Sequence, residues 1–561
     1  MKDFKTRTLP ELLQFASGKY TDTPALSFSD GVPLTYSQLA EKAEQIAANL
    51  YSLGVKKGDR VAIFSNNMPN WGVVYFGISL TGAIIVPILP DFHAMEVKNI
   101  LDHSDSRVVF VCDKLYPKVE ALNKGGKRIF IRINEFALIP EGTKRENLNS
   151  ASAEFTMGST AFTKPEVFED DTAAIIYTAG TTGHSKGVVL SHKNICSNVV
   201  ASSTIPNIKE GDHLLSVLPL SHTYEGTIGF LVPIYNGATI FYLSKPPSVS
   251  VLLPALKKVR PGIMLSVPLL IEKIVRQSVL PAIEKNKLLR TLYHFNPTRK
   301  LIARMAGKKL YRTFGGRLYF FGIGGAALAE DVERFLMDAK FPYAIGYGLT
   351  ETSPLIAGTN AKRTRFRSTG PVIPGGEIRI NNPNPDTGEG EILYRGPNVM
   401  KGYYKDPEKT AEVLTEEGWF HTGDLGMVDR NGYLYIKGRV KTMILGASGE
   451  NIYPEAIESI INNFDFVEDS IVFQEEGGIV ALVNLDKEAL AESFEHFKDG
   501  AKHASEAAAE YSKELIRKVN KQLNPFSRIT KLRHEEEPFE KTPKKTIKRY
   551  LYTRFKKDDS E

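Results

Sequence analysis

Residues 177–192 read Tyr-Thr-Ala-Gly-Thr-Thr-Gly-His-Ser-Lys-Gly-Val-Val-Leu-Ser-His, a loop rich in glycine and hydroxyl groups. Two apolar runs with the composition of strands, Thr172–Tyr177 and Val188–Leu190, flank the loop. Glycines let backbone N–H groups point toward one centre, hydroxyl groups add further donors, and a lysine supplies positive charge. The loop therefore predicts a polyphosphate site. Its candidate ligands are Thr178, Ala179, Gly180, Thr181, Thr182, Gly183 and Lys186.

Two other motifs match part of the same string. A Walker A loop places its lysine at the start of a helix, whereas Lys186 is followed by Gly187 and strand-forming residues. Residues 183–187 also fit the Gly-x-Ser-x-Gly pattern of a hydrolase, with Ser185 as the nucleophile. That pattern requires a helix after the serine, so the strand-like run favours phosphate binding. A serine hydrolase is kept as the alternative from a different class.

Five more strings follow the loop in a fixed order. They are Gly324–Leu328, Tyr347–Thr352, Gly418–Asp424, Gly438–Lys441 and Gly449–Glu458. Together with the loop, and in this order, they resemble the adenylate-forming (AMP-binding) superfamily of acyl-CoA synthetases, adenylation domains and luciferases. The resemblance extends from about Leu34 to Arg549, nearly the whole chain. It implies a ligase that uses ATP and Mg²⁺ to convert a carboxylate to acyl-AMP, releases pyrophosphate, and passes the acyl group to CoA.

The hydrophobic pattern indicates an α/β fold. Periodicity and turn residues predict helices over 34–53 and 71–82, and strands over 61–64 and 83–89. This alternation is typical of mostly parallel sheets flanked by helices.

The resemblance implies two domains of unequal size. We expect a large N-terminal domain over 1–438, which ends in a small β-barrel-like region from Gly370 onward. A hinge over 439–441 would connect it to a smaller, mobile α+β domain over 442–561, and Lys441 matches the hinge position.

Several residues acquire nucleotide-binding roles from the resemblance. Tyr347 would stack on adenine, Thr350 would bind a phosphate, and the carboxylate of Glu351 would hold Mg²⁺. Asp424 would accept from the ribose hydroxyls, with Arg439 as its partner. The expected site also contains Gly324, Gly325, Ala326 and Gly348. Outside this context, Thr350 would be a helix N-cap and Asp424 a turn residue.

His222, in Leu218–Glu225, matches the acyl-pocket motif of the family, where such a residue lies between ATP and the carboxylate. We therefore count it among the catalytic candidates. The spacing of His222 and Glu225 also suggests a metal pair, but no third ligand accompanies them. A structural histidine is the competing interpretation.

The C-terminal string departs from the family pattern. Relatives carry a lysine, four positions after a threonine, that contacts the reacting carboxylate and the α-phosphate, and Thr546 occupies that position here. Lys545 and Lys544 directly precede it, and we expect Lys545 to serve. The other interpretations are a solvated basic tail and a binding protein that has lost catalysis.

The stretch Lys285–Arg312 holds nine basic residues and no acidic one, with apolar residues between them. Its placement resembles the helical segment of long-chain fatty acyl-CoA synthetases, which makes a long-chain fatty acid the expected substrate. Ile436–Lys441 lacks the acidic residue that many long-chain enzymes carry there, so medium-chain or aryl acids and an acyl carrier protein acceptor stay open. Residues 285–312 could contact an anionic membrane or pack as a surface helix pair.

Composition limits the remaining possibilities. A chain of 561 residues, 42% of them hydrophobic, can form more than one core. The two cysteines cannot form a disulfide framework, and the net charge of +6 does not indicate a nucleic-acid partner. The sequence shows no signal peptide and no uninterrupted membrane span. We expect a cytoplasmic protein, with peripheral membrane association left open.

Overall fold

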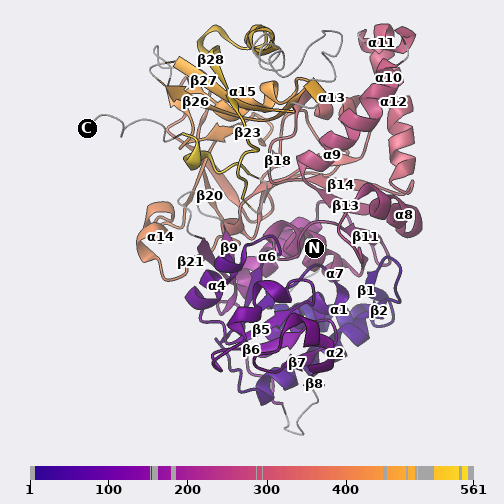
Figure 1. The fold of residues 1–561 in the computed structure, drawn as a ribbon, viewed down its shortest axis with the longest axis vertical. Helices are drawn as coiled ribbons and strands as arrows, with labels where there is room; N and C mark the ends of the chain where they lie inside the picture. The colour runs from indigo at the N-terminus through magenta and orange to yellow at the C-terminus, as the bar shows by residue number, and fades with distance from the viewer. Residues whose placement is uncertain are drawn as a thin grey trace.

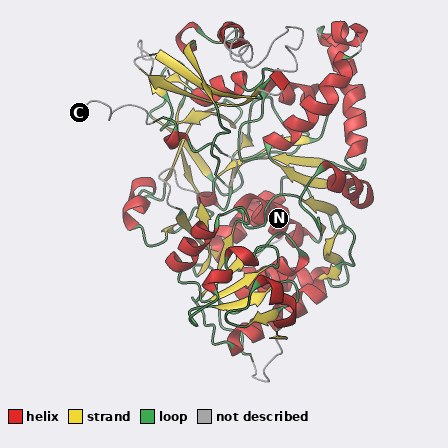
Figure 2. Cartoon of the chain, viewed as in Figure 1, coloured by secondary structure: helices red, strands yellow, loops and turns green. Residues whose placement is uncertain are grey.

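The computed structural model describes residues 7–151, 153–154, 162–178, 185–285, 287–293, 295–445, 451–475, 478–486, 489–490, 511–542 and 546–553. Two mostly parallel sheets with their helices form the larger part of the molecule, and the C-terminal residues lie at one end of it (Figures 1 and 2). The predicted α/β class, with a large N-terminal and a smaller C-terminal domain, is confirmed.

The first sheet has nine strands in the order β21-β10-β9-β4-β3-β5-β6-β7-β8, and its centre is parallel. The parallel strands are β3 (Arg60–Phe64), β4 (Ile84–Ile88), β5 (Val108–Val111), β6 (Ile129–Arg132) and β9 (Thr172–Thr178). Antiparallel strands extend both edges: β7 (Ala137–Ile139), β8 (Ala153–Glu154), β10 (Lys186–Ser191) and β21 (Gly402–Tyr403). The strands predicted over 61–64 and 83–89 are therefore β3 and β4.

The second sheet has seven strands in the order β15-β14-β13-β11-β12-β1-β2, of which only β2 runs antiparallel to its neighbour. Its strands are β1 (Pro24–Phe28), β2 (Leu34–Thr35), β11 (His213–Ser216), β12 (Thr239–Tyr242), β13 (Ile263–Ser266), β14 (Phe320–Ile323) and β15 (Tyr343–Ile345). The helix predicted over 34–53 is α2 (Tyr36–Ser52), because Leu34 and Thr35 pair with β1 and the Thr35 hydroxyl caps the helix by accepting from the Gln38 amide.

Helix α3 (Pro69–Leu80) contacts β3 and β4 of the first sheet and β1 of the second, so it lies between the two sheets. The side chains of this helix are mostly apolar on all of its faces, and every residue from Trp71 to Leu80 is buried. Other helices of this part of the chain are α1 (Leu9–Tyr20), α4 (Ala94–His103), α5 (Leu148–Ala151), α6 (His192–Ser203), α7 (Val232–Asn236) and the π-helix η4 (Tyr224–Leu231).

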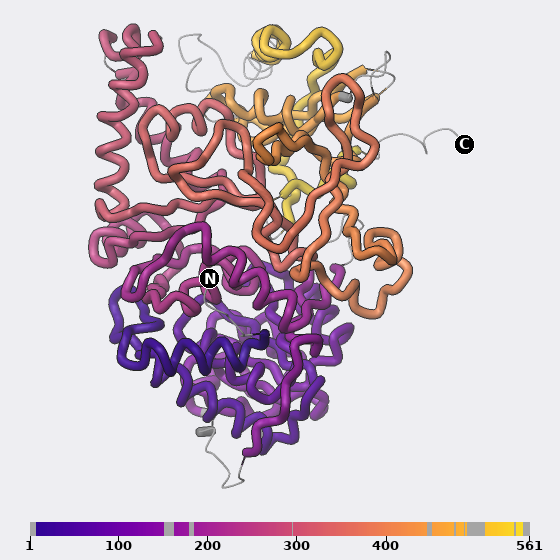
Figure 3. The backbone as a smooth tube through the Cα atoms, turned by 180° about the vertical axis from the view of Figure 1, so that it is seen from behind, coloured from indigo at the N-terminus to yellow at the C-terminus, as the bar shows by residue number. Residues whose placement is uncertain are grey.

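A group of helices packs on one face of the second sheet, and part of this group projects from the molecule in the tube seen from behind (Figure 3). It consists of α8 (Val249–Val259), α9 (Pro268–Ile274), η5 (Val275–Val279), α10 (Leu280–Glu284), α11 (Lys287–Tyr293), α12 (Asn296–Thr313) and α13 (Glu330–Asp338). Helix α12 packs Ala303 and Leu310 into the core beneath this sheet, whereas α11 buries none of its residues.

The region after Gly370 forms an antiparallel five-stranded sheet, β18-β23-β22-β20-β19, as its short β-like runs predicted. The strands are β18 (Gly370–Pro371), β19 (Glu377–Asn381), β20 (Gly390–Arg395), β22 (Phe420–Val428) and β23 (Tyr433–Arg439). Nearby elements are β16 (Tyr347–Gly348), the 3₁₀ turn η6 (Thr350–Thr352), β17 (Leu355–Ala357) and α14 (Pro407–Val413).

The C-terminal elements have a hydrophobic core of their own, which includes Ile457, Val483 and Val519. The elements are β24 (Ile444–Leu445), β25 (Asn451–Ile452), α15 (Pro454–Ile461), β26 (Val467–Glu475), β27 (Gly478–Leu485), β28 (Ile529–Glu535) and a helix over 511–520. Among the residues that the structure describes, no helix combines the length and apolar character needed to span a bilayer.

Candidate functional site

Strands β9 and β10 hold the two ends of the predicted phosphate loop, because Thr178 pairs with Lys186 across the hairpin. The candidate ligands Ala179, Gly180, Thr181, Thr182 and Gly183 lie outside the described residues. Ser185 is followed directly by β10 and not by a helix. The hydrolase alternative therefore lacks the strand–turn–helix context that exposes a nucleophilic serine.

Lys186 and Glu351 meet at the same aromatic ring. The Lys186 ammonium lies 4.8 Å from the ring centroid of Tyr403, whose hydroxyl donates to Glu351 Oε1 at 2.9 Å. Burial and the negative charge of Glu351 raise the pKa of Tyr403 above its usual range, so the phenol keeps its proton and acts as a donor. Tyr403 could not be predicted from the sequence, because its place depends on the pairing of β21 with β10.

Glu351 fits a magnesium ion that arrives with a nucleotide. Among the described residues, no three histidine, cysteine or carboxylate side chains lie close enough together to hold a metal ion. Mg²⁺ commonly takes one or two protein carboxylates, while phosphate oxygens and water complete its shell. A single carboxylate beside a phosphate loop is therefore a sufficient protein contribution.

Tyr347, Asp424 and Arg439 form a second cluster. The Tyr347 hydroxyl donates to Asp424 Oδ2 at 2.7 Å, and Arg439 Nε lies 3.0 Å from Asp424 Oδ1. Asp424 and Arg439 are direct partners in the β22–β23 ladder, which sets this distance. Burial raises the pKa of Asp424, although the positive charge of Arg439 opposes the shift. The sequence predicted the pair of Asp424 and Arg439, and the structure brings it together with Tyr347.

The predicted glycines lie where backbone must approach another group. A Cβ on Gly324 would lie 3.2 Å from the ring of Tyr224, and Gly325 has a φ of +89° in an exposed turn that also holds Ala326. A Cβ on Gly348 would overlap the carbonyl of Pro354, so the loop that carries Thr350 requires glycine there.

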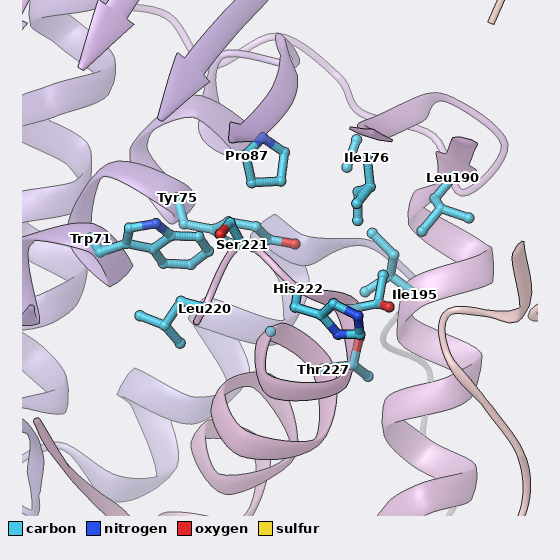
Figure 4. Close-up of a pocket in the computed structure, with 13 residues that line it drawn as sticks. Trp71, Tyr75, Pro87, Ile176, Leu190, Ile195, Leu220, Ser221, His222 and Thr227 are labelled. Carbon is cyan, nitrogen blue, oxygen red and sulfur yellow. The ribbon is translucent and has the colours of Figure 1, made fainter. Parts of the chain in front are cut away.

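His222 borders a narrow apolar cavity (Figure 4). The cavity measures about 20 Å³, enough for roughly one water molecule. Figure 4 shows the imidazole beside Ile195 and Thr227, with Trp71 at the opposite side. Trp71, Tyr75, Pro87, Ala174, Ile176, Leu190, Ile195, Leu220, Ser221, Thr223, Gly226 and Thr227 complete the wall. The sequence predicted His222 here but not Trp71 or Tyr75, which helix α3 supplies from a distant part of the chain.

Glu225 does not form a metal pair with His222. Its side chain is buried beneath the π-helix, where Ser216 Oγ donates to Glu225 Oε1 at 2.5 Å and a Cβ on Gly229 would lie 2.7 Å from Glu225 Cδ. His222 instead accepts through Nδ1 from the amide of Tyr224 at 3.2 Å. Burial raises the pKa of Glu225 to about 8. The carboxyl group is therefore neutral over most of the physiological range.

This raised pKa predicts a pH-dependent stability. The folded protein binds more protons than the unfolded chain between about pH 4.5 and about pH 8, so the free energy of unfolding falls as pH rises through that window. The expected slope is on the order of 1 kcal/mol per pH unit. The variant Glu225→Gln keeps the shape of the neutral acid and should lose this part of the dependence. Urea unfolding of both proteins at the two ends of the window tests it, and parallel profiles would contradict it.

Of the three lysine candidates in the C-terminal part of the chain, the structure describes only Lys441. Lys441 is exposed in a turn in which the Met443 amide donates to the Arg439 carbonyl at 3.0 Å. Lys544 and Lys545 lie outside the described residues. Their flanks are joined, because the Thr542 amide donates to the Thr546 carbonyl at 2.7 Å.

Two family models match the chain. The model described as AMP-binding enzyme matches residues 13–404, and the model described as AMP-binding enzyme C-terminal domain matches residues 441–558. The two matches cover the loop and the strings Gly324–Leu328, Tyr347–Thr352 and Gly449–Glu458, whereas Gly418–Asp424 and nearly all of Gly438–Lys441 lie between them.

The chain is also similar to characterised proteins and to solved structures. It is 29% identical over 502 residues to the long-chain-fatty-acid–CoA ligase heimdall of Drosophila melanogaster, covering 81% of this chain and 72% of that one. It is 28% identical to the long-chain-fatty-acid–[acyl-carrier-protein] ligase AEE15 of Arabidopsis thaliana, covering 87% and 77%. The ATP-bound MatB of Rhodopseudomonas palustris superposes with a TM-score of 0.73 at 24% identity, over 97% of this chain and 98% of that one, a likeness of fold.

Proposed function

The chain belongs to the AMP-binding enzyme family, and from that premise we propose that it is a fatty acid–CoA ligase that forms an acyl-AMP intermediate. The observation that carries the proposal is the convergence of two clusters, Tyr347–Asp424–Arg439 and Lys186–Tyr403–Glu351, at adjoining turns of the chain. The cluster of Tyr347, Asp424 and Arg439 suits a nucleoside, and the cluster of Lys186, Tyr403 and Glu351 suits a polyphosphate. Tyr347 in β16 and Glu351 in η6 are four residues apart in the chain, which links the two clusters.

We assign adenylation to these groups because the reaction brings two anions together. Lys186 would neutralise charge on the departing pyrophosphate, and Thr350 would bind a phosphate oxygen. Mg²⁺, held by Glu351, would supply further positive charge on the phosphates when it is bound. Tyr347 would lie against adenine, while Asp424 would accept from the ribose hydroxyls and be kept in place by Arg439.

The substrate we propose is a long-chain fatty acid. The cavity beside His222 is lined almost wholly by apolar and aromatic side chains, and the Drosophila relative is named as a long-chain-fatty-acid–CoA ligase. At about 20 Å³ the cavity holds no alkyl chain, so acyl binding requires wall side chains such as Trp71 and Tyr75 to move. Medium-chain or aryl acids are the alternative substrates.

The acceptor we propose is the thiol of CoA. An acyl carrier protein is the second candidate, because the Arabidopsis relative is named for that acceptor. Both acceptors carry the same kind of thiol, so the reacting groups of the ligase would be unchanged.

A screen of pyrophosphate release tests the function. The purified chain is given ATP, Mg²⁺ and acids of graded length, alone, with CoA, or with acyl carrier protein. We expect release that depends on fatty acid and a thioester product that depends on CoA. ATP binding without pyrophosphate release for any acid would contradict the proposal, and covalent labelling of Ser185 by a fluorophosphonate would support a hydrolase instead.

The division into an N-terminal part over 1–438, a hinge over 439–441 and a C-terminal part over 442–561 leads to a prediction about Lys441. In the proposed cycle the C-terminal part turns between the two half-reactions, so fixing the backbone at the turn should impede the second. We expect Lys441→Pro to slow thioester formation from supplied acyl-AMP by about tenfold or more, with less effect on acyl-AMP formation. Lys441→Ala is the control. Equal loss in both half-reactions would argue against a hinge.

We also infer that the enzyme meets its poorly soluble substrate at an anionic membrane surface. The basic stretch over 285–312 carries this inference, since basic amphipathic helices bind such surfaces without spanning them.

A further inference from the structure

Helix α12 borders a cationic groove away from the nucleotide and acyl sites. The groove lies between α12 and the segment after α13, has a volume of about 290 Å³, and is lined by Arg304, Lys308 and Lys340 around an apolar floor that includes Leu318 and Phe341. The packing that forms it is close, because a Cβ on Gly307 would lie 2.6 Å from the Cβ of Ala339.

The three cations of the groove have no acidic partners within the described part of the chain. Among the described residues, α12 forms one ion pair, in which Arg299 Nε lies 2.8 Å from Asp338 Oδ2. This pair neutralises Asp338, the carboxylate closest in sequence to Lys340. Neighbouring positive charges repel one another, so their gathering in a cleft is stabilised by an anion. Arginine and lysine side chains are the groups that bind phosphate.

Apolar side chains extend toward solvent from the helical hairpin that α11 and α12 form. Leu288 is 67% exposed on α11, Phe295 is 62% exposed between the helices, and Leu301 and Met305 are 59% and 68% exposed on α12. In Figure 1, α11 stands at the far end of this group of helices, beyond the sheet that they cover. Exposed apolar side chains close to cations are the pattern of a surface that enters the boundary between lipid headgroups and acyl chains.

We propose that this groove binds the phosphate of an anionic lipid while the exposed apolar side chains of α11, of α12 and of the link between them enter the bilayer surface. These side chains are Leu288, Phe295, Leu301 and Met305. The proposal deepens the membrane contact inferred above and rests on it. The groove supplies the specific contact with one headgroup, and the remaining lysines and arginines of residues 285–312 supply general attraction to the anionic leaflet. This arrangement would hold the enzyme where its acid substrate is concentrated.

Vesicle sedimentation of the full-length protein tests the proposal without ATP or acid, so its outcome does not depend on the ligase reaction. Vesicles of phosphatidylcholine are compared with vesicles that also contain phosphatidylglycerol. We expect binding only to the second kind. Each cation near the surface contributes about fivefold to the partition coefficient, so the triple variant Arg304→Gln, Lys308→Gln, Lys340→Gln should bind about a hundredfold more weakly.

A matched variant separates the groove from general charge. Lys257→Gln, Lys258→Gln, Lys309→Gln removes the same charge from exposed positions of the neighbouring α8 and of α12 that do not line the groove. We expect it to bind several times more tightly than the groove variant. Leu301→Ser with Met305→Ser, which alters only exposed side chains, should weaken binding by about tenfold or more. Pyrophosphate release with a short, soluble acid and no vesicles should be the same for all these variants, which checks that they fold.

Three outcomes would overturn the proposal. An equal loss of vesicle binding in the groove variant and the matched variant would show that the attraction is diffuse and that the groove makes no specific contact. Equal sedimentation of the wild-type protein with both kinds of vesicle would show that binding does not require an anionic lipid. Release from phosphatidylglycerol vesicles by CoA or inorganic phosphate, at an ionic strength where chloride has no effect, would assign the groove to a soluble phosphate.

Discussion

Replacement of Gly348 by alanine should slow acyl-AMP formation by about a hundredfold or more, because the new methyl group has no room. Its Cβ would overlap the carbonyl oxygen of Pro354 and lie 2.7 Å from the carbonyl carbon and 3.0 Å from the Cα of Leu355. These are backbone atoms, so no change of rotamer relieves the clash. The Leu349 amide donates to the same carbonyl at 3.0 Å, and this bond would be lost as the loop opens.

The loop between β16 and β17 carries Tyr347, Thr350 and Glu351, so a displacement of its backbone moves three proposed nucleotide contacts together. Pyrophosphate release in a single turnover measures the effect. Gly346→Ala is the matched control, two residues away, because its Cβ would lie 3.2 Å from the flexible Cδ1 of Leu355 and at an ordinary contact distance of 3.8 Å from the carbonyl oxygen of Ala357. A normal rate for Gly348→Ala, or equal loss in both variants, would show that the loop does not position the nucleotide.

The second large effect is expected at the C-terminal lysines. Lys545→Ala should lower the rate of acyl-AMP formation by about a hundredfold to a thousandfold, the usual effect of removing one group that stabilises charge in the transition state. Thioester formation from supplied acyl-AMP and CoA should be spared, because the repulsion between carboxylate and α-phosphate has already been overcome.

Lys544→Ala removes the same charge one residue earlier and is the control. The flanking residues Thr542 and Thr546 are joined by hydrogen bonds, and Lys541 pairs with Ile547, so a shift of register by one residue would be local. If Lys545→Ala adenylates normally and Lys544→Ala does not, the assignment moves to Lys544. If both adenylate normally, the departure at Thr546 means that another group meets the carboxylate.

The parts of the fold that the sequence could predict were those set by local patterns. Alternating helices and strands, the β-rich region after Gly370 and the loop between β9 and β10 all follow from periodicity and glycine placement. Asp424 and Arg439 were recognised because each lies in its own motif, and strand pairing brings them together.

Contacts that depend on distant pairing could not be predicted. Tyr403 reaches Glu351 only because β21 adds to the edge of β10, and residue 403 stands in no motif. Trp71 and Tyr75 look like ordinary core residues of a helix, and only the packing of α3 between two sheets places them at the cavity that His222 borders. Glu225 is likewise buried as a residue of the π-helix η4, which no periodicity indicated.

Arg439 takes part in two contacts at once. Its guanidinium holds Asp424, while its carbonyl accepts from the amide of Met443 in the turn that leads to the C-terminal elements. A replacement of its side chain would break the contact with Asp424, whereas a displacement of its backbone would disturb both contacts. Attempts to engineer the turn, or to exchange the C-terminal part for that of a relative, should therefore join the chains after Arg439 and leave that residue with the strand it ends.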